Sequence, residues 1–335
     1  MSVRAVPDAC PGVYAPHDAA DGALARIRLP GGLVTSHQLH AIADLAHELG
    51  DGNVHLTSRG NLQLRGLDRT DPSLVVRLEA AGLLPSRTHE RVRNILATPL
   101  AGLPAADLDR ALCARPGLSA LPGRFLFALD DGRGDIAAEE PDVCWQAGRA
   151  LLAGVDAGIE GADPVAALIT AAEAFLQVRE SEWRMRELPD SARSAVAQRL
   201  QLAVAGEWQE GLFPATPEPP HLTVAPLLGE LSAAAVHAMA DAAPSAVVTP
   251  WRTVLLVEPT HVPAGVSTDP QLAMVSACAG KPGCAKALAD VRADTRSAMA
   301  AGTLPAGRVH VSGCARRCGA PRGEHIEFVA GEHYL

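Results

Sequence analysis

The chain carries an internal repeat, and a repeat constrains the fold more strongly than any single motif in it. The first copy begins with Gly32-Leu-Val-Thr-Ser-His-Gln-Leu-His-Ala-Ile-Ala-Asp44, whose Thr-Ser pair offers an N-cap for a helix with an apolar stripe. The segment Gly229-Glu-Leu-Ser-Ala-Ala-Ala-Val-His-Ala-Met-Ala-Asp241 repeats the glycine, the hydroxyl residue, His-Ala and Ala-Asp at the same relative positions. A strand is predicted after each helix, over 54–64 and 247–256.

A second similarity follows the first in the same order. Leu121-Pro-Gly-Arg-Phe-Leu-Phe-Ala128 is similar to Leu304-Pro-Ala-Gly-Arg-Val-His-Val311. Each has a proline-marked turn, an arginine and an alternating strand, and follows an Ala- and Asp-rich helical stretch, at 105–115 or 285–301. One such similarity can arise by chance in an Ala-rich chain, whereas two in the same order favour duplication.

The segments between the copies complete the predicted architecture. A hairpin is expected over 143–154, helices over 164–182 and 190–205, and a linker at the proline-rich stretch Pro214–Pro220. The fold class is therefore α+β (mixed α/β), with two pseudo-symmetric halves. A cleft between the halves would be a favoured place for a ligand.

Composition excludes several functional classes. The chain has 335 residues, 48% of them hydrophobic, and a formal net charge of −9, which argues against a nucleic-acid partner. No apolar run approaches the roughly 18 residues of a membrane span. The first residues lack the pattern of a signal peptide. We expect a cytoplasmic protein with no membrane partner, in which thiols stay reduced.

Four of the seven cysteines form the motif most informative about chemistry. They occur as Cys278-Ala-Gly-Lys-Pro-Gly-Cys284 and Cys314-Ala-Arg-Arg-Cys318. Four thiolates suffice for a [4Fe–4S] cluster, and small residues between them allow close backbone approach. Lys281, Arg316 and Arg317 would offset the negative charge of such a cluster.

Two alternatives remain for these four thiols. Structural zinc sites pair their cysteines two to four residues apart, a spacing that fits the second pair and not the first. The thiols could also be unligated. The other cysteines, Cys10, Cys113 and Cys144, have no partner spacing and are predicted to be small buried residues.

Arginines recur beside the predicted strands of both copies. Arg59 follows Thr-Ser, Arg252 follows Pro-Trp, and Arg93 lies in the segment Arg91-Val-Arg-Asn94. The guanidinium group binds planar anions through a fixed fork of donors, so these residues could line a polycarboxylate site. The alternative is that each is a solvated surface arginine or half of an ion pair.

Together these motifs resemble the sirohaem-dependent sulfite and nitrite reductases. The similarity lies in the two cysteine pairs, in Thr57-Ser-Arg59-Gly-Asn-Leu-Gln63, in Arg93-Asn94 and in Pro99-Leu-Ala-Gly102. That family has two ferredoxin-like half-domains and two α/β domains related by a pseudo-twofold axis. The resemblance implies domains over 1–75, 76–213, 214–265 and 266–335.

One stretch departs from the reductases. They carry a lysine pair beside the bound anion, where this chain has Leu121-Pro-Gly-Arg124-Phe-Leu126-Phe. Leu126 cannot donate a proton, and the Arg124 guanidinium is effectively never deprotonated. We therefore expect no reduction of sulfite or nitrite.

The chain is similar to one branch of that family, the precorrin-3B synthases. The similar segments are Ala9-Cys-Pro-Gly12, Arg26-Ile-Arg-Leu-Pro-Gly-Gly32, Thr249-Pro-Trp-Arg-Thr253 and His310-Val-Ser-Gly-Cys-Ala-Arg-Arg-Cys318. The resemblance implies a monooxygenase that hydroxylates precorrin-3A at C20 and forms a γ-lactone in aerobic cobalamin biosynthesis. It implies O2 as co-substrate and NADH as ultimate electron donor, directly or through a separate reductase.

The resemblance also implies cofactors and binding residues. A [4Fe–4S] cluster would be held by Cys278, Cys284, Cys314 and Cys318, and a non-haem iron is a second candidate cofactor. No catalytic residue is assigned, because the histidines form no convincing iron site and no dinucleotide fingerprint is present. The residues predicted to bind the tetrapyrrole are Arg59, Arg93, Asn94, Arg124, Trp251 and Arg252, with Trp251 stacking on the macrocycle or packing inside the protein.

Two other functions stay open. The first is a sirohaem-dependent sulfite or nitrite reductase, the only interpretation that requires sirohaem. The second is a non-enzymatic iron–sulfur electron-transfer or sensor protein. The arginine-bearing first half argues against the second, because an electron carrier needs no such lobe.

Overall fold

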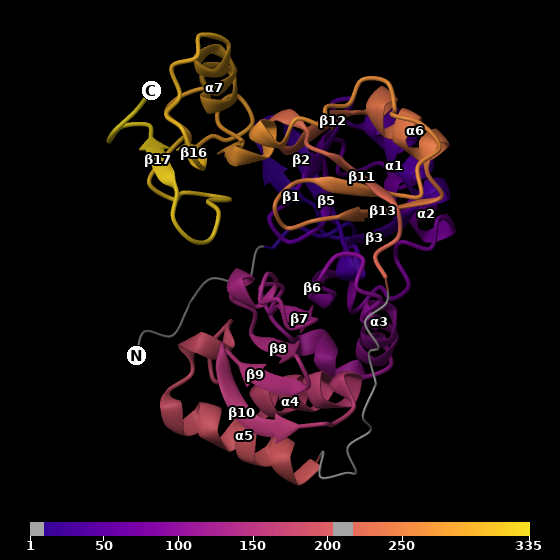
Figure 1. Cartoon of the computed structure of the whole chain (residues 1–335), viewed down its shortest axis with the longest axis vertical. Helices are drawn as coiled ribbons and strands as arrows, with labels where there is room; N and C mark the ends of the chain where they lie inside the picture. Colours follow the sequence, from indigo (N-terminus) through magenta and orange to yellow (C-terminus); the bar gives the residue numbers. More distant parts are fainter. Residues whose placement is uncertain (1–9, 204–216) are drawn as a thin grey trace. The chain divides into compact units, whose positions relative to one another are not determined.

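The computed structural model describes residues 10–203 and 217–335 (Figure 1). The chain divides into two compact units, the first built around Leu84–Pro219 with Arg28–Gly32, the second from Pro11–Ile27, Leu33–Leu83 and Pro220–Leu335. This division is coarser than the four predicted domains, whose bounds stay a prediction. The expected linker, 214–220, lies in part outside the described residues, which resume at 217. Within the described ranges, every helix is too short or too polar to cross a bilayer.

The two repeat helices form as predicted in the second unit. They are α1 (Ser36–Leu49) and α6 (Ala233–Ala242), and they pack against each other. The Thr35 hydroxyl accepts the Gln38 N–H at 3.3 Å, and the Gln38 side chain accepts the Thr35 N–H at 3.0 Å. This capping box satisfies two N–H groups that a helix start leaves free. Ser232 caps α6 by accepting a backbone N–H at 3.2 Å.

Two antiparallel sheets lie beside these helices, and each sheet takes one strand from the other copy. The first has the order β1 (His17–Ala19), β2 (Gly22–Ile27), β5 (Leu62–Leu67), β4 (Asn53–Leu56) and β12 (Glu230–Ser232). The second has the order β11 (His221–Val224), β14 (Val254–Val257), β13 (Ser245–Val248) and β3 (Leu33–Thr35). Strand β3 of the first copy pairs with β13 of the second, and β12 of the second pairs with β4 of the first. This reciprocal exchange is the pairing expected of a pseudo-twofold duplication. A further helix, α2 (Ser73–Ala80), packs against α1.

The strand predicted after each repeat helix is instead a hairpin. The single-strand prediction is wrong at its middle, because β4 and β5 flank the turn Thr57–Asn61, and β13 and β14 flank Thr249–Thr253. In both turns the first threonine hydroxyl accepts the N–H of the fifth residue, at 3.1 Å and 3.3 Å. The fourth residue has a positive φ in both, 61° at Gly60 and 59° at Arg252. The threonine side chain therefore makes a turn that apolar alternation does not reveal.

The second unit also contains a small parallel sheet. Its order is β15 (Val275–Ala277), β16 (Val309–Ser312) and β17 (Ile326–Val329), and α7 (Val291–Ala300) connects the first two strands. The core beneath it is small, formed by Leu228, Ala277, Val291, Val309 and Val311.

The first unit is built on a five-stranded sheet. Its order is β10 (Val155–Glu160), β9 (Arg149–Leu152), β8 (Val143–Gln146), β7 (Phe127–Asp130) and β6 (Ile95–Ala97). Its helices are α3 (Ala105–Cys113), α4 (Pro164–Val178) and α5 (Asp190–Ala203). Phe125 lies at the centre of the core, with its ring centroid 5.1 Å from that of Phe127 and 4.9 Å from that of Phe175. The predicted hairpin is confirmed as β8 and β9.

The parallel parts of the two units have the same element order. The series β6, α3, β7, β8 corresponds to β15, α7, β16, β17, with parallel pairing throughout. The similar segments 121–128 and 304–311 run into β7 and β16. With the exchanged strands, this order confirms the predicted duplicated α+β architecture.

Candidate functional site

The four motif cysteines gather at one edge of the small sheet in the second unit. Cys278 follows β15, and Cys314 follows β16 after one residue. Because these strands are parallel neighbours, the residues beyond their carboxyl ends meet at the same edge. All four cysteines line one cavity of about 540 Å³. Burial raises the pKa of Cys318, and the charges of the other three thiols raise it further.

The spacing of the four sulfurs can be compared with that of a structural zinc site. Among the described residues, no three cysteine sulfurs lie within 4.8 Å of one another. In a tetrahedral zinc site with Zn–S bonds of roughly 2.3 Å, the sulfurs lie only about 3.8 Å apart. The four thiols are therefore not arranged as the closed tetrahedron of a structural zinc site. Of the other cysteines, Cys144 is buried as predicted, whereas Cys10 and Cys113 are half-buried.

Two glycines allow close backbone packing around residues 278–284, which we call the cysteine loop. Gly280 has a φ of 65°, and a Cβ there would lie 2.8 Å from Val291 Cγ2. A Cβ at Gly313 would lie 2.8 Å from the Ala287 side chain. The Gly313 N–H donates to Cys278 Sγ at 3.1 Å. A close N–H donor of this kind stabilises a thiolate ligand.

The three cations expected near the cluster differ in their surroundings. Arg316 lines the cysteine cavity, and its charge lowers the pKa of Cys318 against the larger effect of burial. Lys281 lines a neighbouring cavity. Arg317 forms ion pairs with Glu327 at 2.6 Å and Glu332 at 2.8 Å, so its charge is shared with two carboxylates.

The neighbouring cavity, which we call the basic cavity, has a volume of about 620 Å³ and also lies within the second unit. Cys278 and Cys318 line both cavities. Its volume lies in the range of roughly 300–1,000 Å³ typical of cofactor and small-molecule sites. Six basic side chains and four carboxylates line it, namely Arg26, Arg65, Arg252, Lys281, Arg292 and Arg296, with Asp21, Asp51, Glu230 and Asp290. The excess of positive charge suits an anionic ligand.

Arg65 fastens the first antiparallel sheet to the cysteine loop. Its guanidinium donates to Asp21 through Nε at 2.9 Å and Nη2 at 3.0 Å, and Nη2 also donates to the Gly283 carbonyl at 3.0 Å. A Cβ at Gly283 would lie 2.8 Å from both Arg65 Nη2 and Asp21 Oδ2. Glycine therefore lets the loop approach the ion pair this closely.

The Thr57-to-Gln63 motif supplies a turn and an orienting side chain. Thr57 and Ser58 line the basic cavity, as does Gln63. Gln63 Oε1 accepts from Arg26 Nε at 3.0 Å and Nη2 at 2.6 Å across the β2–β5 pairing. Arg26 was not predicted as a site residue. Its presence in the cavity follows from a long-range pairing register rather than from local sequence.

Arg252 enters the basic cavity from the second matched turn. Its Nη2 donates to the Gly319 carbonyl at 2.6 Å. A Cβ at Gly229 would lie 2.8 Å from Arg252 Cδ, and one at Gly319 would lie 2.8 Å from its Nη2. Two glycines thus make room for a side chain whose own backbone adopts a left-handed conformation, which is uncommon outside functional or strained sites.

Arg59 and Trp251 occupy the third position of the two matched turns and are half-buried.

Three other predicted site residues, Arg93, Asn94 and Arg124, lie in the first unit instead. Arg93 is buried and forms a bidentate ion pair with Asp109, in which Nε and Nη2 each donate to a carboxylate oxygen at 2.7 Å. The Arg124 guanidinium lies 5.2 Å from the centroid of the Trp183 ring.

Asn94, the third of these residues, is also buried. Its Nδ2 donates to the carbonyls of Gly123 at 2.9 Å and Arg91 at 3.1 Å. Arg93 and Asn94 thus make contacts that hold their own segment. Tetrapyrrole binding by all six predicted residues stays a prediction.

Sequence reasoning also missed several charged residues that line the basic cavity. Arg292 and Arg296 lie one turn apart on α7, and both donate to Glu230, at 2.5 Å and 3.2 Å. That spacing on one helix face was the available signal. His55 Nε2 lies 2.9 Å from Asp51 Oδ2, also in this cavity.

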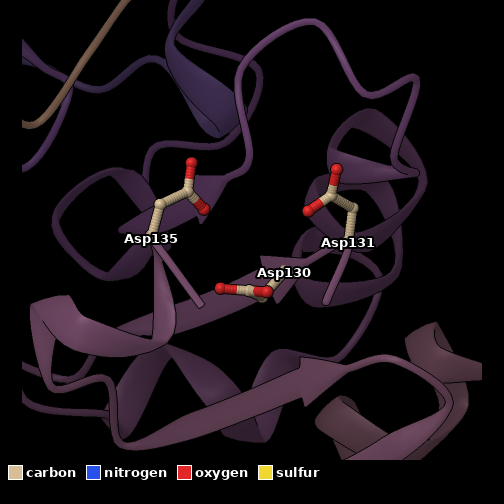
Figure 2. A group of neighbouring side chains, drawn as sticks. All are labelled: Asp130, Asp131 and Asp135. Carbon is tan, nitrogen blue, oxygen red and sulfur yellow. The ribbon is translucent and has the colours of Figure 1, made fainter. Parts of the chain in front are cut away.

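An aspartate cluster in the first unit has a structural explanation (Figure 2). Carboxylate oxygens of Asp130, Asp131 and Asp135 lie within 4.8 Å of one another. Asp130 accepts four backbone N–H groups, two of them from Gly132 at 2.8 Å and Ala137 at 2.9 Å. Burial raises the pKa of Asp130, but these hydrogen bonds outweigh burial and hold it below its ordinary value. The cluster therefore organises the loop 130–137.

Comparisons with known proteins agree with this geometry. Residues 17–77 match the nitrite/sulfite reductase ferredoxin-like half domain. A ferredoxin–nitrite reductase of Synechococcus elongatus is 38% identical over 140 residues, which are 36% of this chain and 27% of that protein. The chain thus matches only about a quarter of the length of such nitrite reductases.

Two further relatives match most of the chain. A precorrin-3B synthase of Sinorhizobium sp is 27% identical across 96% of this chain and 80% of its own length. The structure of the NirA protein of Mycobacterium tuberculosis superposes with a TM-score of 0.63, covering 89% of this chain and 69% of that one at 17% identity, a likeness of fold. With the duplicated architecture, these comparisons make the chain similar to the sulfite and nitrite reductases in its first half domain and in its fold.

Proposed function

We propose that this chain is a monooxygenase like the precorrin-3B synthases, which hydroxylates precorrin-3A at C20 and forms a γ-lactone in aerobic cobalamin biosynthesis. The observation that carries the proposal is the wall shared by the two cavities, because Cys278 and Cys318 line both. A redox centre on these thiols would lie directly beside an anionic ligand in the basic cavity. The near full-length alignment with the Sinorhizobium precorrin-3B synthase supports this choice within the family.

We assign a [4Fe–4S] cluster to Cys278, Cys284, Cys314 and Cys318. When bound, such a cluster supplies single-electron transfer. The chain's own contribution is to hold and tune it. The Gly313 N–H donates to Cys278 Sγ, and the positive charges of Arg65, Lys286 and Arg316 lie along the same cavity. Both features favour the ionised thiolates that the cluster needs.

The basic cavity would bind the acetate and propionate groups of the tetrapyrrole. Arg26 presents a guanidinium already oriented by Gln63, and Arg252 presents another beside Gly319. Oriented arginine forks bind carboxylates with two parallel hydrogen bonds. His55, held by Asp51, adds a group in the same cavity that can carry a proton. Hydroxylation consumes O2, two electrons and two protons, leaving one oxygen atom in the product and one in water.

A non-haem iron is not part of this proposal. Such iron is commonly held by two histidines and a carboxylate. In the described part of the chain, no histidine belongs to a group of three ligand atoms within 4.8 Å. The residues present therefore do not fit that cofactor. Electrons would come from NADH as ultimate donor, directly or through a separate reductase.

The second candidate is a sirohaem-dependent sulfite or nitrite reductase. The 38% identity to a nitrite reductase favours it. Against it stand the two positions where those reductases carry lysines. Arg124 stacks near Trp183, and Leu126 is 3% exposed, so neither offers an ammonium donor.

The test is turnover by anaerobically purified holoprotein supplied with precorrin-3A, 18O2 and a reductant. The proposal expects a hydroxylactone carrying one labelled oxygen atom. Arg26→Ala should weaken substrate binding and leave the cluster spectrum unchanged, because Arg26 lines the basic cavity and not the cysteine cavity. Absence of the labelled product from protein with a full cluster would contradict the proposal. An intense sirohaem spectrum with turnover of nitrite or sulfite would instead establish the second candidate.

A further inference from the structure

The fourth residue differs between the two matched turns, although the backbone conformation is the same. Gly60 and Arg252 both have a left-handed φ, 61° and 59°. Glycine adopts this conformation at no steric cost, whereas any side chain crowds its own backbone there. Because the first copy makes the turn with glycine, the turn itself does not require an arginine. The reason for Arg252 therefore lies in what its side chain reaches.

The Arg252 side chain joins the basic cavity to the segment that carries Cys318. Arg252 lines that cavity, and its Nη2 donates to the carbonyl of Gly319, the residue after Cys318, at 2.6 Å. Glycine makes room at both ends, because a Cβ at Gly229 would lie 2.8 Å from Arg252 Cδ and one at Gly319 would lie 2.8 Å from Nη2. A guanidinium has five N–H donors in a fixed fork, so one such group can hold a main-chain carbonyl and a ligand carboxylate together.

The segment around Cys318 depends on such contacts. Cys318 is the exposed one of the four motif cysteines, whereas the other three are half-buried, and the residues on either side of it are exposed as well. Packing therefore holds Cys318 less firmly than its partners. Two arginines fasten its segment to other parts of the unit, Arg252 through Gly319 and Arg317 through ion pairs with Glu327 and Glu332.

We propose that Arg252 is a positioning residue that holds an anionic ligand and the main chain beside Cys318 with one guanidinium. A carboxylate bound in the basic cavity would fix that guanidinium and, through the Gly319 carbonyl, the segment that carries Cys318. Ligand binding and the order of this cysteine segment are then coupled, and such coupling is reciprocal. The inference rests on the cluster and the anionic ligand of the proposed function, but not on hydroxylation.

The test measures how fast holoprotein with its cluster assembled loses iron to bipyridine, an uncharged chelator, without oxygen. The ligand probe is mellitate, a planar polycarboxylate, at saturation. Mellitate should slow iron loss about fivefold or more in the unaltered chain. Arg252→Gly should lose iron faster, and mellitate should not protect it, although calorimetry should still show binding through the other basic residues. Arg252→Lys, whose ammonium lacks the fork, replaces it if the glycine variant assembles no cluster, and should be protected less than the unaltered chain.

Two matched variants separate this coupling from affinity and from simple loosening of the segment. Arg26 lines the same cavity, so Arg26→Ala should weaken mellitate binding but keep the protection at saturation. Arg317 lies outside both cavities, so Arg317→Gln should loosen the segment and also keep the protection. Thermal unfolding adds a readout without the ligand, in which Arg252→Gly should have a higher Tm than Arg252→Ala because glycine relieves the left-handed backbone.

The inference is overturned if mellitate protects Arg252→Gly as well as it protects the unaltered chain. It is also overturned if the unaltered chain binds no mellitate, or binds it without a change in iron loss. Equal Tm values for Arg252→Gly and Arg252→Ala would contradict the backbone argument. A second series with uroporphyrin III separates this inference from the proposed function. Protection by mellitate without binding of uroporphyrin III would contradict the tetrapyrrole site and leave the role of Arg252 intact.

Discussion

Replacing Arg65 with methionine tests how the cysteine loop is held. Methionine keeps the apolar stem of arginine as far as the position of Nε but removes every donor to Asp21 and Gly283. Breaking a fully buried ion pair costs about 3–5 kcal/mol, whereas exposed pairs contribute about 0–1 kcal/mol. The Arg65 and Asp21 side chains are 11% and 26% exposed, between these limits. We expect Arg65→Met to lower the unfolding free energy of the second unit by about 2–3 kcal/mol.

The assay is urea unfolding followed by the visible absorbance of the proposed cluster, whose cysteines all lie in the second unit. Arg69→Met is the matched control, because the Arg69–Asp18 pair is 53% and 76% exposed and should matter little. Arg65→Met should also lose its cluster faster under mild denaturant. If Arg65→Met and Arg69→Met behave alike, Arg65 does not fasten the loop.

Three further substitutions test the cluster, the glycine packing and the aspartate loop. Cys314→Ser should lose iron and activity together by iron analysis, while Cys10→Ser keeps both. Gly280→Ala should destabilise the second unit by about 1–3 kcal/mol more than Gly302→Ala in urea unfolding, because both sites have positive φ but only Gly280 would place a Cβ 2.8 Å from a neighbour. Asp130→Asn should speed amide exchange in the loop 130–137. The folded-state pKa of Asp130 is lowered, so its contribution to the free energy of unfolding is fully present above the unfolded pKa of about 3.9. That contribution is lost as the pH falls through the folded-state pKa. Asp130→Asn should remove this pH dependence. Unchanged iron in Cys314→Ser, equal stability of the glycine variants, or unaltered exchange would each contradict the corresponding contact.

Local features of the fold were readable from the sequence. The helices α1 and α6 follow from apolar spacing and from hydroxyl caps at Thr35 and Ser232, which act within one turn of chain. The hairpin turns were missed, because a threonine side chain rather than a glycine or proline pair makes them. The exchange of β3 and β12 between copies was also hidden, since strand partners distant in sequence leave no local pattern.

The candidate site was likewise predictable only where its residues are close in sequence. Cysteine spacing predicted one shared location, and the structure brings all four thiols to one cavity. Arginines were harder to interpret, because their role depends on which carboxylate is near. Arg93 is engaged by Asp109, whereas Arg26, not predicted, is oriented into the basic cavity by Gln63. Sequence identifies an arginine but not its partner.

The central claim is that a redox cluster and a tetrapyrrole site share a wall in this chain. Electron paramagnetic resonance of the reduced cluster, with and without saturating precorrin-3A, tests it most directly. Because Cys278 and Cys318 line both cavities, we predict four irons per chain and a cluster signal that shifts when substrate binds. A chain that binds the tetrapyrrole and leaves the cluster signal unchanged would contradict the account.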